Sequence, residues 1–404
     1  MDTHSWLRML ISLDTTSRLS NLGLIETVRD ALRRLGIDPW LNASATQPKA
    51  NLFATLPARD GSTQGGIILS GHTDVVPVDG QPWRSDPFTL TEREGRLYGR
   101  GSADMKGFIA AVLAWAPSYV ANPGCKPVHL ALSYDEEVGC LGARALLHEV
   151  VQRGIRADGC IVGEPTSMQP VIAHKGISLY HCRVHGRAAH SSLTPQGCNA
   201  IEYAARLISH IRDVADACKA HGPFDEGYDV PFSTLSTNLA SGGMALNVIP
   251  AECEFSYEIR NLPGSPAAGI QARVSHYVES TLLPRMRAEC PDARIDITPG
   301  VSVPALDGCA QTDIARLVLS LAARQPRKVA YVTEAGLFQQ AGIPAIVCGP
   351  GSIEQAHKAD EYIALEQLEQ CDRFLQRLGL ALGQRRQGSF EEVFKPHQAA
   401  GRFL

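Results

Sequence analysis

The sequence predicts an α/β protein: a mainly parallel sheet with helices on both faces, and an inserted domain of βαββαβ order. Two observations support this fold class. Short apolar runs alternate with helical patterns up to about residue 177 and again after about residue 303, and such alternation is typical of parallel sheets. Between these stretches the predicted order is βαββαβ, the ferredoxin-like pattern, which folds into an antiparallel sheet backed by two helices.

The elements of the first stretch follow from its periodicity. Apolar residues at helical spacing predict an amphipathic helix at residues 24–35, which Gly36 ends. Short apolar runs predict buried strands, and longer Ala-rich or periodic patterns predict helices. In this way we expect strands at 67–70, 128–134 and 159–162, and helices at 105–120 and 143–151.

The middle stretch changes character at residues 177–185, which alternate like a half-exposed strand. It continues with a helix at 199–214, strands at 232–239 and 252–259, a long helix at 265–288 and a strand at 294–298. A helix at 312–323 and a strand at 345–348 then resume the first pattern. The sequence therefore predicts a discontinuous domain of residues 1–177 and 304–404 that carries an inserted domain of residues 178–303. The polar segment 384–404 is assigned no role.

Bulk properties exclude several classes of function. The net charge of -4 and the pI near 6.4 provide no basic face for nucleic acid. No run approaches the ~20 apolar residues that span a bilayer, and the start shows no secretory signal. The 11 cysteines form no C-x-x-C pair, so we expect free thiols, no zinc ribbon and a cytoplasmic location.

Histidine and carboxylate side chains follow several predicted strands or begin a predicted helix in the outer domain. They are His72 and Asp74 after the strand 67–70, Asp104 in a Gly-rich turn, Glu136 and Glu137 after the strand 128–134, Glu164 after the strand 159–162, and His357 in a loop beyond the strand 345–348. In open parallel sheets, ligands collect beyond the carboxyl ends of the strands. Imidazole and carboxylate without thiolate suit catalytic zinc, cobalt or manganese.

Each of these residues also has a structural explanation. Asp104 stands where an Asp is favoured as a helix cap, and Glu136 with Glu137 would also suit a solvated acidic turn. A histidine at a strand end or in a loop is often only hydrogen-bonded. Cys140, close to the acidic pair, lacks a positioned base, so we do not expect it to be a nucleophile.

Seven segments in order carry a resemblance to a known family. They read SGHTDVVP at 70–77, GRGSADMKG at 99–107, SYDEEVG at 133–139, GEPT at 163–166, RAAHSS at 187–192, EIRNLPG at 258–264 and GPGSIEQAH at 349–357. With these segments the chain resembles the M20 family of metallopeptidases and deacylases over nearly its whole length, from about residue 13 to residue 380.

The resemblance implies a site with two divalent metal ions, zinc or alternatively cobalt. It assigns His72 and Glu164 to one ion, Glu137 and His357 to the other, and Asp104 to a bridge between them. Asp74 would orient the imidazole of His72 by accepting its second N–H. Glu136 would be the general base that takes a proton from water and passes it to the leaving amine.

The resemblance also assigns roles to the inserted domain as a lid and as the surface of a homodimer. His190 would support the oxyanion, supplied in the family from the partner subunit, and Arg260 would grip the substrate carboxylate. Asn247 and, in the outer domain, Thr333 would contact the substrate. In the alternative interpretations Arg260 only pairs with Glu258, and Asn247 is a turn residue.

The expected activity is hydrolysis of the amide of an N-acyl amino acid, a small-molecule substrate. Within the family the motifs favour N2-acetyl-L-ornithine, which yields L-ornithine and acetate in an arginine-pathway step. N-acetylcitrulline, N-succinyl-diaminopimelate and other N-acyl amino acids are alternatives, because the metal chemistry is indifferent to the side chain. A dipeptidase of the same family and a non-catalytic binding protein are further alternatives.

Overall fold

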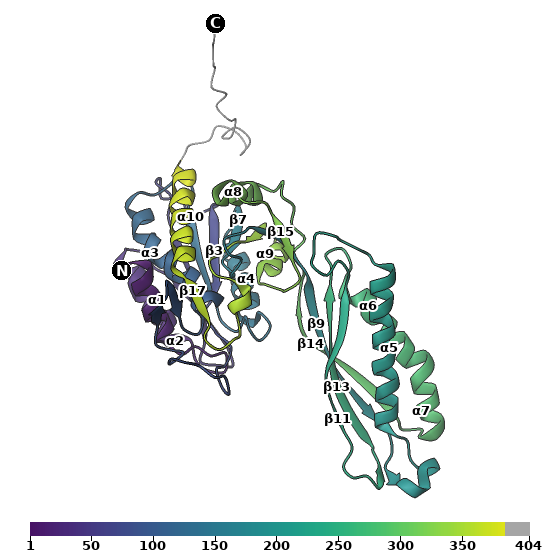
Figure 1. The fold of residues 1–404 in the computed structure, drawn as a ribbon. Coiled ribbons are helices and arrows are strands. Elements are labelled where there is room, and N and C mark those ends of the chain that lie inside the picture. The colour runs from purple at the N-terminus through teal and green to yellow at the C-terminus, as the bar shows by residue number, and fades with distance from the viewer. Residues whose placement is uncertain (384–404) are drawn as a thin grey trace.

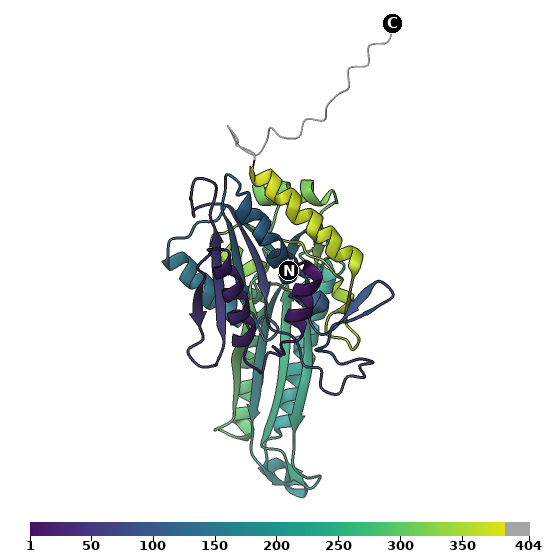
Figure 2. The ribbon, with the colours of Figure 1, turned by 90° about the vertical axis from the view of Figure 1, so that its left-hand side faces the viewer.

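The computed structural model describes residues 1–383, and the segment 384–404 lies outside the described residues. Figure 1 shows two lobes, an α/β lobe that contains the N-terminus and an elongated second lobe. The view in Figure 2 shows the second lobe extending from one end of the α/β lobe. In residues 1–383, no helix combines the length and the apolar character that crossing a bilayer requires.

The α/β lobe is built on an eight-stranded sheet. Its strands lie in the order β1 (Trp40–Ala43), β2 (Ala50–Leu56), β6 (Val128–Ser133), β3 (Ile67–His72), β7 (Gly159–Val162), β16 (Ala345–Val347), β8 (Val171–His174) and β15 (Arg327–Val329). The central pairs β6–β3, β3–β7 and β7–β16 are parallel, as is β15–β8 at one edge. Every residue of β3, β6 and β7 is buried, which explains their short apolar sequence runs.

Helices cover both faces of this sheet, so the predicted α/β fold class is confirmed. On one face a single core joins α1 (Thr3–Ile11), α2 (Leu22–Arg34), α3 (Gly107–Ala121), α8 (Asp313–Ala322) and α10 (Leu365–Gly383). On the other face pack α4 (Leu141–Gln152) and α9 (Ala335–Gln340). A small sheet of β4 (Thr91–Arg93), β5 (Arg96–Tyr98) and β17 (Tyr362–Ala364) lies beside the first face.

The second lobe contains a four-stranded antiparallel sheet. Its order is β11 (Thr234–Gly242), β13 (Glu252–Asn261), β9 (Gly176–His185) and β14 (Arg294–Val303). The helices α5 (Ala200–His221), α6 (Ala267–Tyr277) and α7 (Leu283–Glu289) pack on one face of this sheet. The chain order is therefore βαββαβ, as the sequence predicts. A short ladder joins β10 (Ala189–His190) to β12 (Val248–Ile249). The division into domains at residues 177 and 304 stays a prediction.

Two predicted helices differ from the structure. The single helix expected at 265–288 is interrupted, because Val278–Leu282 forms a π-helical turn between α6 and α7. Pro284 follows that turn, and a proline has no N–H to continue the α-helical ladder. The helix expected from residue 105 begins at Gly107, because Asp104 and Met105 have non-helical backbone angles. The turn that carries Asp104 is thus irregular and not part of α3.

Candidate active site

Three neighbouring parallel strands bring most of the predicted site residues to one edge of the sheet. His72 ends β3, and it is paired in register with Ser133 at the end of β6. Glu136 and Glu137 lie in the turn after β6, and Glu164 follows β7, the other neighbour of β3. Because parallel strands end at the same edge, these side chains meet there, as the sequence argument requires.

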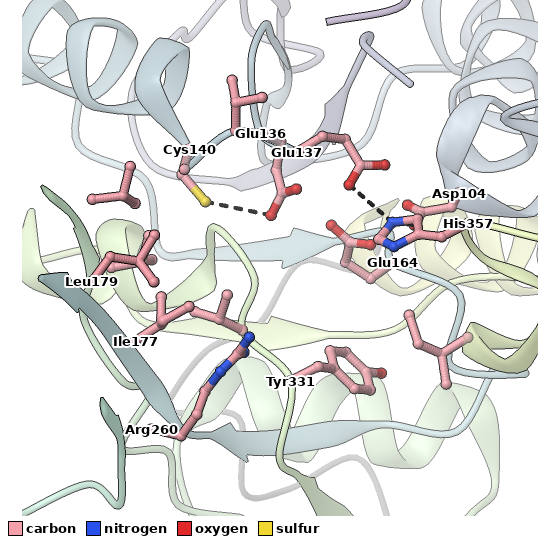
Figure 3. A pocket seen from close by; sticks show the side chains of 16 residues that line it. Asp104, Glu136, Glu137, Cys140, Glu164, Ile177, Leu179, Arg260, Tyr331 and His357 are labelled. Carbon is pink, nitrogen blue, oxygen red and sulfur yellow. Dashed lines mark hydrogen bonds and ion pairs between the residues drawn. The ribbon is translucent and has the colours of Figure 1, made fainter. Parts of the chain in front are cut away.

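The two oxygens of the Asp104 carboxylate face two different histidines. Its Oδ1 lies 3.0 Å from His72 Nε2, and its Oδ2 lies 3.5 Å from His357 Nε2. Glu164 Oε1 lies 3.8 Å from the same His72 nitrogen, and Glu137 Oε2 lies 3.0 Å from His357 Nε2. Asp104 therefore joins one histidine–glutamate pair to a second, and Figure 3 shows the second of these pairs, His357 with Glu137.

The protonation of these groups reflects their crowding. Burial raises the pKa of Glu137 to about 7, and the charge of Asp104 adds to the rise. Burial and the charge of Asp104 also raise the pKa of Glu164 well above its usual value. Hydrogen bonds with Asp104 and Glu137 raise the pKa of His357 to about 10. The carboxyl groups of Glu137 and Glu164 therefore keep a proton to a higher pH than a carboxyl group in water does.

The donor set fits divalent cations. Four carboxyl groups gather around two imidazoles: those of Asp104, Glu136, Glu137 and Glu164. Ligand atoms of His72, Asp104 and Glu137 lie within 4.8 Å of one another, as do those of His72, Glu136 and Glu164. Such a surplus of buried negative charge is costly unless cations balance it. Imidazole with carboxylate oxygen suits zinc, cobalt or manganese.

Asp74 holds the Glu136–Glu137 turn in place. Its Oδ1 accepts the backbone N–H of Glu136 at 3.0 Å, and its Oδ2 accepts that of Glu137 at 3.3 Å. The hydroxyl of Ser17 donates to Oδ2 at 2.7 Å. The second ring nitrogen of His72 lies 2.9 Å from the main-chain oxygen of Asp74 and 3.6 Å from its carboxylate. The main-chain oxygen is therefore the nearer partner, where the sequence analysis expected the carboxylate.

Glu136 points into the pocket, and within residues 1–383 it forms no ion pair with a lysine, arginine or histidine. The thiol of Cys140 donates to its Oε1 at 3.4 Å (Figure 3), which leaves Oε2 for other contacts. Burial raises the pKa of Glu136 well above its usual value, and the charge of Glu137 contributes in the same direction. A carboxylate with a raised pKa in a cleft has the properties of a proton acceptor at neutral pH.

A cavity of about 350 Å³ opens from this cluster toward the second lobe. Its far wall is apolar, with Ile177 and Leu179 from β9 and Val301 from β14. Arg260 of β13 points into the same cavity (Figure 3). The guanidinium also pairs with Glu258, at 3.1 Å from Nε to Oε1. Arg260 thus lines the pocket and also forms an ion pair with Glu258, so its position fits both a contact with substrate and a structural pairing.

Three predicted substrate or oxyanion residues do not line the cavity. His190 and Asn247 are exposed on the second lobe, where the carbonyl of Asn247 accepts the N–H of Ser191 next to His190. Thr333 is fully buried, and its hydroxyl accepts the backbone N–H of Ala335 at the start of α9. Tyr331 and Val332, just before Thr333, line the cavity instead.

Further buried polar residues surround the site. Glu334, which the family resemblance places with Thr333 at a position of substrate contact, is 1% exposed, its Oε1 accepts the hydroxyl of Ser133 at 2.5 Å, and burial raises its pKa to about 7. Lys49 forms a buried ion pair with Asp135, directly before the acidic pair, at 2.5 Å. Nothing in the local sequence marks Lys49, because its partner is distant along the chain. The acidic run Asp135–Glu137 was visible, but only the fold separates its three roles.

The sheet, the cluster at its carboxyl edge and the cavity between two lobes define a metal-dependent amidohydrolase. The chain belongs to peptidase family M20/M25/M40, whose sequence pattern matches residues 68–381. The predicted family resemblance is thus confirmed.

Curated relatives match over most of the chain. The acetylornithine deacetylase of Proteus mirabilis is 36% identical over 362 residues, which are 88% of this chain and 89% of that protein. The acetylornithine deacetylase of Myxococcus xanthus is 35% identical over 373 residues, 91% of this chain and 94% of that protein.

Solved structures share the fold at low identity. The aminopeptidase PepT of Bacillus cereus has a TM-score of 0.74 at 18% identity and covers 95% of this chain and 98% of its own. An M20 family metallo-carboxypeptidase of Sulfolobus solfataricus has a TM-score of 0.74 at 17% identity, with 95% and 100% covered. The Bacillus subtilis YXEP protein, described as a dinuclear metal binding peptidase, has a TM-score of 0.64 at 15% identity, with 94% and 97% covered.

Proposed function

We propose that the protein uses two divalent metal ions to hydrolyse the amide of an N-acyl amino acid, with N2-acetyl-L-ornithine as its substrate. The observation that supports this most directly is the placement of the Asp104 carboxylate, whose two oxygens face His72 and His357 at 3.0 and 3.5 Å. A carboxylate placed between two histidines in this way would suit a position shared by two bound ions.

In this proposal His72 and Glu164 would hold one ion, Glu137 and His357 would hold the other, and Asp104 would serve both. When bound, the ions would lower the pKa of water in the site and polarise the scissile carbonyl. The main-chain oxygen of Asp74, 2.9 Å from His72 Nδ1, accepts the ring N–H and so leaves Nε2 free to act as a ligand.

Glu136 is the general base of the proposed reaction. Its Oε1 is occupied by the thiol of Cys140, so its Oε2 takes the proton from water and then delivers it to the leaving amine. The backbone contact with Asp74 fixes the start of the Glu136 side chain. A raised pKa suits both halves of this transfer, because the group must gain and lose a proton near neutral pH.

Arg260 binds the α-carboxylate of the substrate, since its guanidinium already lines the cavity and its fork matches a carboxylate. In doing so it exchanges or shares its contact with Glu258. The acyl group lies toward the metal ions, and the amino-acid portion lies toward the second lobe. Asn247 and Thr333 stay weaker proposals as substrate contacts, because the first is exposed and the second is buried away from the cavity.

His190 supports the oxyanion from the partner subunit of a homodimer that forms through the second lobe. Three observations support this arrangement. His190 does not line the cavity of its own chain, β11 is an edge strand of its sheet, and large apolar side chains are exposed on and after it. These side chains are Leu239 at 70%, Met244 at 92% and Leu246 at 105% exposure. An exposed edge with apolar side chains suits pairing with a second copy.

Acetylornithine is chosen because the curated relatives carry that activity in their names, and with it comes a role in arginine biosynthesis. Zinc is the proposed native ion and cobalt the alternative. A cytoplasmic location is supported by the 11 cysteines, none of which forms a disulfide.

A substrate panel tests the proposal. Purified protein loaded with zinc or with cobalt is assayed for acetate release from N2-acetylornithine and N-acetylcitrulline, and for cleavage of N-succinyl-diaminopimelate and several dipeptides. Preferred turnover of acetylornithine supports the substrate. Cleavage of another member of the panel replaces the substrate but keeps the chemistry. Absence of both metal binding and hydrolysis across the panel contradicts the proposed function and favours a binding protein.

A further inference from the structure

A buried carboxylate holds the turn that carries Asp104. Glu361 is 1% exposed, and its Oε1 accepts the backbone N–H groups of Ala103 at 2.9 Å and of Asp104 at 3.0 Å. Its Oε2 accepts the backbone N–H of Gly101 at 2.9 Å and the guanidinium of Arg100 at 2.7 Å. Four donors thus converge on one carboxylate, and two of them belong to the irregular turn that presents the bridging ligand.

The same network reaches the loop of His357. Arg100, also 1% exposed, donates to the carbonyl of Lys358 at 3.2 Å and to Oε1 of Gln81 at 2.5 Å. The amide of Gln81 in turn donates to the carbonyl of His357 at 2.9 Å. Glu361 itself lies four positions after His357 in the chain. Two separate loops that carry proposed metal ligands are therefore fastened to one charged group.

The two halves of the site differ in how the fold supports them. His72 ends β3 and Glu164 directly follows β7, so the ladder between these parallel strands places both residues. Asp104 and His357 instead lie in turns, and His357 has a left-handed backbone with φ +64. The side chain of His72 is 1% exposed, whereas that of His357 is 56% exposed. We call the part formed by His357 and Glu137 the outer half.

We propose that Glu361, Arg100 and Gln81 are positioning residues that build the outer half of the metal centre. The ion beside His357 and Glu137 then depends on this network more than the ion beside His72 and Glu164 does. Glu361 acts through the backbone of the Asp104 turn, and Gln81 acts through the backbone of His357. This inference rests on the two-ion function proposed above.

The physical reason is the entropy of an unsupported loop. A ligand on a mobile turn must be ordered when the ion binds, and that ordering weakens the binding. Groups behind the ligands commonly change metal affinity by about 10–100-fold. We expect an effect of that size at the outer half, because the network holds the Asp104 turn and the His357 loop through hydrogen bonds to their backbone groups.

The test compares two variants with a matched control. Gln81→Met removes the contact with the carbonyl of His357 at a partly exposed position, and Glu361→Gln removes the charge that gathers the four donors. Gln64→Met is the control, because Gln64 also joins two loops, through the N–H of Arg156, but precedes β3 at the opposite end of the sheet. His357→Ala identifies the outer ion, since it removes an imidazole of that half.

The measurements are the zinc content after dialysis at fixed free zinc and the zinc affinities of chelator-treated protein by calorimetry. We expect two ions in the wild type and in Gln64→Met. We expect Gln81→Met to weaken the outer ion by about tenfold or more and to leave the inner ion unchanged. Glu361→Gln should weaken the outer ion at least as much, and it should weaken the inner ion less than the outer one, because Asp104 serves both ions but His72 and Glu164 keep the support of their strands. If it does not fold, because Arg100 is left as an unpaired buried charge, Gln81→Met decides alone.

Unchanged zinc affinities in Gln81→Met, or an equal loss of both ions, would overturn the inference while leaving the two-ion function intact. A wild-type protein that binds no zinc at all would instead contradict the proposed function itself. The far-ultraviolet circular dichroism of each variant confirms that the change in metal binding is not a loss of fold.

Discussion

The free energy of unfolding of the metal-free protein should fall as the pH rises from 6 to 8. The reason is Glu137, whose side chain is only 7% exposed and whose pKa burial raises from 4.5 to about 7. A carboxyl group with a raised pKa in the folded state favours folding while it is protonated. That contribution is complete below pH 4.5 and is lost as the pH rises through about 7.

The size of the effect follows from the two pKa values. Linkage gives a contribution of about 1 kcal/mol at pH 6 that is almost entirely lost by pH 8. Glu164 changes stability in the same direction, because burial raises its pKa too. So does His357, with a pKa raised to about 10 by Asp104 and Glu137. The pKa of Asp104 is lowered, and its contribution is lost only as the pH falls below the range of the experiment.

The assay is urea denaturation of chelator-treated protein at pH 6 and pH 8, followed by circular dichroism and compared with zinc-loaded protein. Zinc replaces the protons on the proposed ligands, so the loaded protein should lose less stability, and its remaining loss should come from groups that are not ligands, such as Glu334. The metal-free variant Glu137→Gln should lose at least about 1 kcal/mol less than the wild type between the two pH values, because it removes the Glu137 titration and also one of the groups that raise the pKa of His357. A wild type whose metal-free stability is constant or rises with pH, or a variant with the same pH dependence, would refute the reasoning.

Three further predictions concern the catalytic groups. Glu136→Gln should lower kcat by about 10²–10⁴-fold and keep both ions, and a parallel loss of zinc content would make Glu136 a ligand. His190→Ala should lower kcat. Mixing this variant with Glu136→Gln should restore up to about a quarter of the activity, because about half of the dimers are then mixed and each mixed dimer has one complete site. A mixture no more active than its components would place His190 elsewhere. Arg260→Leu should raise KM about 10–100-fold for substrates with a free α-carboxylate and not for their amides, and equal effects on both would disconnect Arg260 from that group.

Much of the fold and of the histidine–carboxylate cluster could be predicted because both depend on regular structure. Every residue of β3, β6 and β7 is buried and most of them are apolar, and parallel neighbours end at one edge of the sheet. Residues that follow those strands, such as His72 and Glu164, must therefore be neighbours. The order βαββαβ was visible for a similar reason, since each of its elements has its own periodicity.

Other features depend on contacts between segments far apart in the chain. Glu361 stands between Asp360 and Tyr362 without any pattern around it, and its partners lie about 260 positions away. The same holds for Lys49 and Asp135, which are 86 positions apart. A buried charge is recognisable only when its partner is known. Tertiary packing also decided that Thr333 is buried while Tyr331 lines the cavity.

The roles of residues in the second lobe are hard to predict from sequence for a different reason, because these roles depend on where that lobe lies. Arg260 reaches the cavity because β13 is paired with β9, which runs directly from the α/β lobe. His190 lies in a short ladder elsewhere in that lobe and does not line its own cavity. A residue that acts on the transition state must be within hydrogen-bond reach of the oxyanion. His190 can therefore have its proposed role only if the second lobe moves or a second subunit supplies it. The mixed-dimer experiment distinguishes supply by a second subunit from movement of the lobe within one chain.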